Sequence, residues 1–363
     1  IYTLLALLGV KVFRWYVAII VAIGLIGSFM GIAVSAYGMM NKAYVKEMWD
    51  ATYGRGSWDE VVKIALDNGW ESTPISASAT IGAFVDTFWA YWGATAAQYF
   101  GGEMKSPKAG FIAGVFGCAI FLMIFYSLTA VTVYGAYGSF ISQYAFAVEV
   151  APDQFTIMEP VMTALPVFVA PLAKPMPWLM AITAIIPAMW VTNCAGATLL
   201  VGPRQPFAWA FDRFFPEIFS HVNERFHSPH WAVLLTGAIA YTFIPLALAG
   251  VFVAMVDCTF IYIIRCIFGA LTGVVLPYRR PDIWERGFKI TVGGVPLISI
   301  CGILALFWWW WGLAISAWWL DFIGMAYLSF WIAFGAFIWF AYAEYNKKRG
   351  IPVEAIYSVI PPA

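Results

Sequence analysis

Few side chains in this sequence could do chemistry, and those of most interest interrupt apolar runs. Asp86 stands in the outer part of one run, whereas Asn193 and Arg265 stand within two others. A charge inside a bilayer is costly, so both ionisable groups are candidates for a functional site. The alternatives are structural: an interfacial carboxylate for Asp86, an ion pair or headgroup contact for Arg265, and an interhelical hydrogen bond for Asn193.

Metal and enzyme chemistry have little support. All three histidines lie in one polar segment, SHVNERFHSPHW (residues 220–231), where His227 and His230 have a chelating spacing but no cysteine or second pair beside them. The five cysteines sit in or beside apolar runs without a CxxC pair, which is typical of small buried hydrophobic residues. The polar segments carry no phosphate loop, nucleophile elbow or paired catalytic carboxylates. We therefore expect neither an enzyme nor a metal site.

The composition requires a lipid environment. Of the 363 residues, 62% are hydrophobic and 11% are charged, with a mean hydropathy of +0.80. A soluble domain has about 45–50% apolar and roughly 25% charged residues, and it cannot bury so much apolar surface. The net charge is zero, which gives no bias toward nucleic acid. We predict an all-α integral membrane protein that forms one transmembrane domain over residues 1–363.

Apolar runs of about 20 residues, the length that crosses a bilayer as a helix, recur along the chain. Residues 2–9 resemble the last turns of a spanning helix, and the chain starts inside this apolar stretch without a methionine or a signal peptide. We therefore expect that an N-terminal part is missing. Eight complete spans are predicted at 12–39, 79–101, 109–138, 176–201, 230–254, 256–278, 293–314 and 319–343.

The distribution of basic residues predicts the orientation. If the spans alternate, one side of the membrane carries fourteen of the twenty Lys and Arg residues and the other side carries five, with Arg265 inside a span. The positive-inside rule puts the first side, and with it the C-terminus, in the cytoplasm. The long segments 41–75 and 139–175 then face outward. Within the first of them, Ser57 and Glu60 have the spacing of a capping box at a helix N-terminus.

A glycine inside a span needs a reason, because irregular backbone survives in lipid only where it is buried or lines a cavity. Gly24, Gly27 and Gly31 suit a small-residue face for helix packing. Gly93 has a different context: bulky aromatic side chains, including Trp92, precede it and small ones such as Thr95 follow it. This pattern fits a discontinuous helix with an aromatic wall beside an unwound patch, although a simple kink would also explain it.

The chain resembles the amino acid–polyamine–organocation superfamily of permeases. One motif is the aromatic–glycine stretch of Trp89 to Gly93 followed by the polar knot GEMKSPK (residues 102–108). Three further segments match the family in the expected order, namely Leu4–Trp15, Leu199–Gly237 and Leu276–Ile298. The resemblance implies a five-plus-five inverted-repeat fold, of which this chain holds the end of the fourth span through the twelfth. Unwound first and sixth helices would meet at the substrate, with Gly93 at the break of the sixth, and the first would lie outside this chain.

The implied function is secondary active transport of amino acids or related amines across the cell membrane by alternating access. A permease of the same fold for another organic solute and a non-transporting membrane sensor are the alternatives. Thr95 stands where many relatives carry a glutamate, and no lysine occurs near Gly24, where some proton-coupled relatives have one. We expect no cofactor and leave a coupling ion, H⁺ or Na⁺, open. Candidate substrate-binding residues are Trp89, Trp92, Gly93, Thr95, Asn193 and Ala197.

Overall fold

The computed structural model describes residues 1–72, 76–249, 254–287, 289–317 and 322–354. Its regular structure in these ranges is helical, apart from one antiparallel hairpin of β1 (Thr291–Val292) and β2 (Val295–Pro296). Seven helical stretches in the described part are long and apolar enough to cross a membrane. The prediction of an all-α, multi-pass membrane protein is therefore confirmed. The seven stretches are Val10–Met40, Pro107–Tyr137, Pro177–Phe211, His230–Leu248, Phe260–Arg279, Leu297–Ile315 and Gly324–Lys348.

One predicted span is absent from that set because it is not a single helix. Residues 79–101 fall in three short segments: α5 (Ala77–Gly82), α6 (Phe84–Tyr91) and η1 (Trp92–Glu103), of which the last is a 3₁₀-helix. The chain then passes through α7 (Pro107–Phe111) and the π-helical turn η2 (Ile112–Gly117) into α8 (Cys118–Tyr137).

The chain forms two compact units. Unit 1 comprises Ile1–Pro74, Phe116–Ala208 and Ile218–Thr236, and unit 2 comprises Ile75–Val115, Trp209–Glu217 and Gly237–Ala363.

In unit 1, α1 (Tyr2–Leu7) leads into α2 (Val10–Met40), which packs against α8 and α11 (Pro177–Val201). A Cβ atom at Gly24 would lie 2.9 Å from the ring of Trp190, and one at Gly27 would overlap Ile186. The indole N–H of Trp190 donates a 2.9 Å hydrogen bond to the hydroxyl of Ser28. The predicted small-residue face of this span is therefore confirmed as the contact surface of α2 with α11.

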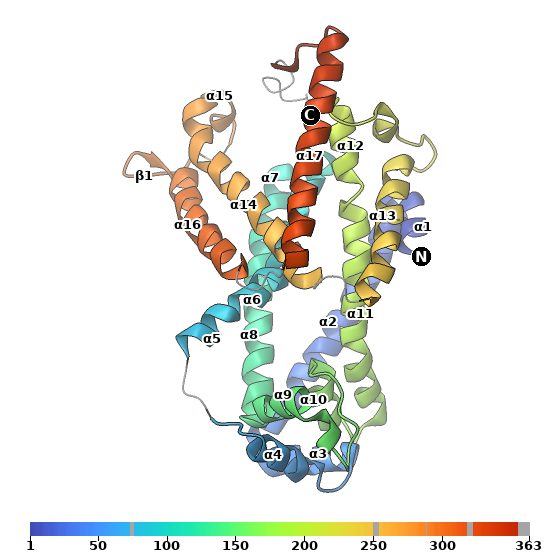
Figure 1. The fold of residues 1–363 in the computed structure, drawn as a ribbon, viewed down its shortest axis with the longest axis vertical. Helices are drawn as coiled ribbons and strands as arrows, with labels where there is room; N and C mark the ends of the chain where they lie inside the picture. Colours follow the sequence, from blue (N-terminus) through green and yellow to red (C-terminus); the bar gives the residue numbers. More distant parts are fainter. Residues whose placement is uncertain (73–75, 250–253, 288, 318–321, 355–363) are drawn as a thin grey trace. The chain divides into compact units, whose positions relative to one another are not determined.

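The two long polar segments of unit 1 pack on each other. Figure 1 shows α3 (Lys42–Tyr53), α4 (Ser57–Asp67), α9 (Phe140–Val150) and α10 (Leu165–Leu172) gathered at one end of α2 and α8. Trp49 is fully buried among them, with ring centroids 4.7 Å from Phe140 and 5.5 Å from Tyr144. This aromatic core explains how segments 41–75 and 139–175, predicted to share one side of the membrane, form a common structure.

Tyrosine hydroxyls fix α10, a helix whose Pro171 lacks an N–H. The hydroxyl of Tyr44 donates to the carbonyl of Leu172 at 2.7 Å, and that of Tyr53 donates to the carbonyl of Val167 at 2.9 Å. Burial, with the nearby Tyr144 hydroxyl adding to it, raises the pKa of Tyr53 well above its usual value. These phenols therefore stay protonated and remain donors over the whole physiological pH range.

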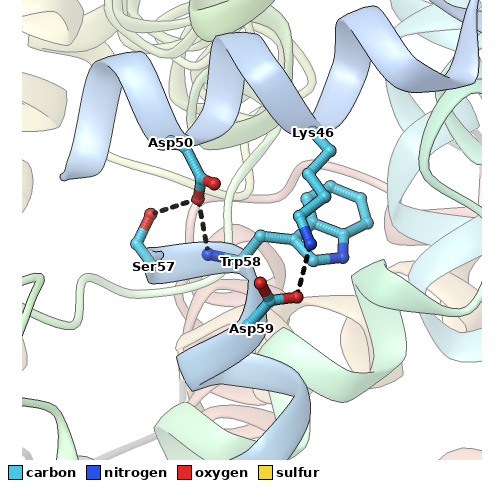
Figure 2. Close-up of polar contacts among 5 residues, drawn as sticks. All are labelled: Lys46, Asp50, Ser57, Trp58 and Asp59. Atoms are coloured by element: carbon cyan, nitrogen blue, oxygen red, sulfur yellow. Dashed lines mark hydrogen bonds and ion pairs between the residues drawn. The ribbon is translucent and has the colours of Figure 1, made fainter. Parts of the chain in front are cut away.

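The predicted capping box is wrong. The N-cap of α4 is Gly56, with φ +88°, and Ser57 is already in the helix. Asp50 of α3 caps α4 instead: its Oδ1 accepts from the Trp58 N–H at 2.9 Å and from the Ser57 hydroxyl at 3.3 Å (Figure 2). The Glu60 carboxylate instead accepts hydrogen bonds from Thr156 and Ile157. The acceptor that caps α4 therefore comes from the neighbouring helix α3 and not from the local Ser57–Glu60 pattern.

Unit 2 is organised around α14 (Ala254–Arg279), which packs along α16 (Leu297–Ala317). The two helices are joined by α15 (Pro281–Trp284) and the β1–β2 hairpin. The Ser299 hydroxyl donates a 3.0 Å hydrogen bond to the carbonyl of Val274 across this pair. Helix α6 packs against both α14 and α16, and α17 (Phe322–Lys348) contacts α14. The discontinuous span thus lies against the α14–α16 pair.

Candidate substrate site

The discontinuous span changes helix type between Tyr91 and Trp92. The α-helix α6 ends at Tyr91, and the following twelve residues form η1. A 3₁₀-helix rarely exceeds three or four residues, because its hydrogen bonds have poorer geometry, so a run of this length often marks a functional hinge. Within the described part of the chain, no heavy atom of another residue lies within 4 Å of the position that a Cβ would take at Gly93. The prediction of a broken helix at this point is confirmed, with open space beside its glycine.

Aromatic rings border the break. The Trp92 ring lies 5.7 Å from the ring of Tyr262 on α14, between centroids. Tyr262 in turn meets Trp309 of α16 edge-on at 5.9 Å and is only 7% exposed. Three elements far apart in sequence therefore contribute one ring each to a wall beside the start of η1.

Thr95 joins this wall through hydrogen bonds. Its Oγ1 donates to the carbonyl of Trp92 at 3.0 Å, which satisfies a backbone acceptor in the first turn of η1. The Tyr262 hydroxyl lies 3.4 Å from the same oxygen and donates to it. A glutamate at position 95, as the resembled family often carries, would bring a charge to this contact; the threonine keeps it neutral.

Arg265 lies one helical turn after Tyr262 and contacts the later part of η1. Its guanidinium donates a 3.0 Å hydrogen bond to the Gln98 side-chain carbonyl and another to the Tyr99 hydroxyl. Its Cζ lies 4.9 Å from the Tyr99 ring centroid and 5.6 Å from that of Tyr262. Among the described residues no carboxylate lies within ion-pair distance of it. The ion pair with a neighbouring helix that the sequence left open for Arg265 is therefore not seen in the described part.

Tyr262 is a residue of this wall that was not predicted from the sequence. The signal was present, because Tyr262 and Arg265 are three residues apart and so share one face of a helix. A tyrosine one helical turn from an intramembrane arginine lies on the same helix face and is therefore a candidate for the same site. What the sequence could not supply was the partner element, since Gln98 and Tyr99 are more than 160 residues away.

The other two candidates belong to unit 1. Asn193 and Ala197 lie four residues apart on α11 and therefore on one face of it. The Asn193 Oδ1 is buried and has no hydrogen-bond partner in the described part of the chain. The interhelical bond expected for this side chain is thus not made by its oxygen. Between them, Gly196 faces Tyr2 and Phe13, whose rings lie 3.0 and 3.5 Å from where a Cβ would stand.

Two residues singled out from the sequence are only partly described. Trp89 and Asp86 belong to the backbone of α6, but their side chains lie outside the described part of the structure. The predicted role of Trp89 beside the substrate stays a prediction.

A hollow in unit 1 does not suit a zwitterion. It has a volume of about 320 Å³ and is bordered by α2, α8, α10 and α11. Its lining is mostly apolar, with Trp190 and the buried Ser35 hydroxyl, which has no hydrogen-bond partner among the described residues, as two of the few polar contributors. Its described lining includes no charged side chain and none of the candidate substrate residues.

The sequence model of the family described as amino acid permease matches residues 4–313. The chain belongs to this family. The permease is accordingly a multi-pass membrane protein of a transporter family, not of an enzyme family. The match includes η1, the wall residues Tyr262 and Trp309, and Arg265. No solved structure matches the permease.

The histidine segment of the permease has a structural contact. A ring nitrogen of His230 lies 2.9 Å from the Leu7 carbonyl oxygen, so its N–H donates there. Within the described residues, no three His, Cys, Asp or Glu side chains gather as they would around a metal ion.

Proposed function

We propose that this permease is a secondary active transporter that moves amino acids or related amines across the cell membrane by alternating access. The observation that carries the proposal is the change from α-helix to 3₁₀-helix at Trp92 and Gly93, within an apolar span of a member of a permease family. Broken helices inside membranes are characteristic of transporter binding sites.

The break offers suitable chemistry for a zwitterionic or cationic solute. The faces of Trp92 and Tyr262 attract an ammonium group by about 0.5–2 kcal/mol, or cover an apolar side chain. We assign substrate contact to Trp89, Trp92, Gly93 and Thr95 at the break, and to Asn193 and Ala197 on α11.

The proposed orientation of the protein in the membrane follows from the distribution of its Lys and Arg residues. The GEMKSPK knot and the Lys347–Arg349 cluster carry lysine and arginine and are assigned to the cytoplasm, together with the C-terminus. The aromatic core around Trp49 is assigned to the outside. On α8, Ile120, Ile124 and Leu128 are 44–55% exposed on one face, which supports contact with lipid there.

The test is uptake by the full-length protein in proteoliposomes. A panel of labelled amino acids and their amines is offered with an inward proton gradient, an inward sodium gradient, both or neither. Saturable uptake of an amino acid or amine supports the proposal, and the gradient that drives it identifies the coupling ion. Uptake restricted to an unrelated organic solute, or binding without uptake, would replace the proposal with a different permease or a sensor.

A further inference from the structure

The connection between α14 and α16 lies at the ends of two apolar stretches that are long enough to cross a membrane. The stretch in α14 ends at Arg279, and the stretch in α16 begins at Leu297. The backbone N–H of Leu297 donates a 2.8 Å hydrogen bond to the carbonyl of Ile290, which ties the β1–β2 hairpin to the first residue of α16. Because β2 ends at Pro296, directly before that residue, the hairpin lies close to the membrane surface.

One face of the hairpin is apolar. Val292 pairs with Val295 across the two strands, so their side chains lie on the same face. Ile290 stands two residues before Val292, where the ladder continues, and extends that face. The exposed fractions of the three residues are 51% for Ile290, 56% for Val292 and 42% for Val295. These three residues form what we call the hairpin face, and it points away from the protein's own core.

The turn of the hairpin is well suited to hold this face in place. Gly293 and Gly294 have φ values of +59° and +82°. Positive φ at both central residues is the requirement of the tight two-residue turn whose twist matches that of the flanking strands. The turn therefore fixes the register in which Val292 and Val295 stand opposite each other.

Positive charge gathers in the same connection. Residues 278–296 hold four basic and two acidic side chains, an excess of two positive charges in a chain whose net charge is zero. Arg280 forms an ion pair with Asp282 at 2.9 Å. The other three basic residues, Arg279, Arg286 and Lys289, are exposed. Exposed basic side chains thus accompany the exposed hairpin face within one short segment of unit 2.

An apolar face beside positive charge fits the surface of an anionic membrane. Apolar side chains gain free energy when they leave water for the boundary between headgroups and acyl chains, and basic side chains are attracted to anionic headgroups. The spans on either side hold the hairpin near that boundary. We propose that this connection is an interfacial anchor that binds anionic phospholipid, with the hairpin face in the headgroup layer and Arg279, Arg286 and Lys289 against its phosphates.

Two other environments for the hairpin face lead to different results. If the face lies against protein, its shielding from water does not depend on the lipid. If it lies in water, a probe on it behaves like a probe on the opposite face, where alternation along the strand places Thr291. Contact with anionic lipid differs from both, because it depends on lipid charge and is confined to the hairpin face.

The experiment uses the full-length protein in nanodiscs of phosphatidylcholine alone or of an equal mixture of phosphatidylcholine and phosphatidylglycerol. A fluorescent amino acid that reports the polarity of its surroundings replaces Val292 in one protein. In the matched control it replaces Thr291. Emission is measured with and without lipid that carries a nitroxide quencher high on its acyl chains, which distinguishes cover by lipid from cover by protein.

Two changes should weaken the proposed contact. One variant removes the three positive charges by combining Arg279→Gln, Arg286→Gln and Lys289→Gln. Its control removes the same number of charges from another segment by combining Lys347→Gln, Lys348→Gln and Arg349→Gln. Without any charge substitution, an ionic strength of about 1 M shortens the screening length to about 3 Å and tests the same attraction should the first variant fold poorly.

We expect the probe at position 292 to emit at shorter wavelength and to be quenched by nitroxide lipid in the mixed discs, while the probe at position 291 changes little. Each basic residue near an anionic surface shifts the equilibrium about fivefold, so removal of three should shift it about a hundredfold toward water. Quenching at position 292 should then fall to its level in phosphatidylcholine, whereas the control variant should match the wild type. Equal quenching at position 292 in both kinds of disc, equal behaviour of positions 291 and 292, or no effect of either the charge variant or salt would overturn the proposal.

Discussion

The Tyr262 hydroxyl donates to the Thr95 hydroxyl at 3.4 Å, which joins α14 to the first turn of η1 directly after Gly93. A hydrogen bond of this length is weak. The stronger link is the ring of Tyr262, which contacts Trp92, Trp309 and Arg265. Tyr262 therefore acts on the site through its ring more than through its hydroxyl.

Substitutions at position 262 should separate these contributions. Tyr262→Phe keeps the ring and should leave the substrate KM within about threefold of the wild type, since the lost bond is neutral and long. Tyr262→Ala removes the wall and should raise KM about two- to thirtyfold. Uptake kinetics in proteoliposomes measure both. If the two variants raise KM equally, Tyr262 contributes to substrate binding through its hydroxyl and not through its ring.

The tryptophans before the break should matter more than those at a membrane boundary. Trp89→Ala and Trp92→Ala should each weaken substrate binding about two- to thirtyfold, because an indole covers an apolar side chain or an ammonium group. Trp89 lies in the last turn of α6, four residues before Gly93. The matched control is Trp178→Ala, at the start of α11, whose side chain is 58% exposed. Small and equal effects from all three, with normal expression, would mean that Trp89 and Trp92 serve packing only.

Two glycines should respond differently to the same substitution. The added methyl of Gly93→Ala meets no described neighbour within 4 Å, so the protein should fold at normal yield while transport falls through altered backbone at the break. Gly27→Ala places a methyl group against Ile186, and overpacking of this kind typically costs about 1–3 kcal/mol. Thermal unfolding in detergent and uptake are compared for both. A Gly93→Ala protein that unfolds as early as Gly27→Ala would show that the space beside Gly93 is filled.

The sequence predicted those features that depend on local composition. Spans such as 12–39 and 176–201 agree with α2 and α11 within two residues at each end, because lipid imposes a length of about 20 apolar residues. The break at Gly93 was predictable because a glycine between bulky and small residues weakens a helix locally. Neither inference required knowledge of a distant partner.

The sequence could not identify features that depend on long-range contacts. Asp50 displaces the expected capping box of α4 because folding brings another helix to its N-terminus. Arg265 contacts Gln98 and Tyr99, more than 160 residues away, for the same reason. Both pairings are fixed by tertiary packing, which overrides the nearest matching pattern in the chain.

The cap supplied by Asp50 can be tested against a neighbouring carboxylate, as both are visible in Figure 2. Asp50→Ala leaves the Trp58 N–H and the buried Ser57 hydroxyl without their acceptor and should lower stability by about 1–2 kcal/mol. Asp59→Ala breaks only the 2.5 Å ion pair with Lys46, whose side chains are 69% and 44% exposed, and should cost less than about 1 kcal/mol. Thermal unfolding in detergent compares the two, and a larger loss for Asp59→Ala would contradict the assigned cap.

Glu60 should make the contact between α4 and residues 156–157 sensitive to acid. Its Oε1 accepts from the Thr156 N–H at 2.7 Å, the Thr156 hydroxyl at 2.6 Å and the Ile157 N–H at 2.9 Å. Desolvation raises the pKa of Glu60, but the hydrogen bonds from Thr156, Ile157 and Met158 together outweigh it and leave the pKa below its usual value. Because the folded pKa is lowered, the stabilisation is complete above the unfolded pKa of about 4.3 and is lost as the pH falls through the folded value.

The measurement is hydrogen exchange of the Thr156 and Ile157 amides, corrected for the intrinsic effect of pH. In the wild type, protection should be constant from pH 7 to about pH 5 and then fall in more acidic solution. Glu60→Gln should reduce protection at pH 7 by about 1 kcal/mol, at the low end for bonds to a charged group because solvent screens this carboxylate. The difference between the two proteins should shrink as the pH falls, since protonation removes the charge from the wild type as well. Asp59→Asn is the control on the same helix. A difference between wild type and Glu60→Gln that grows in acid would contradict the lowered pKa.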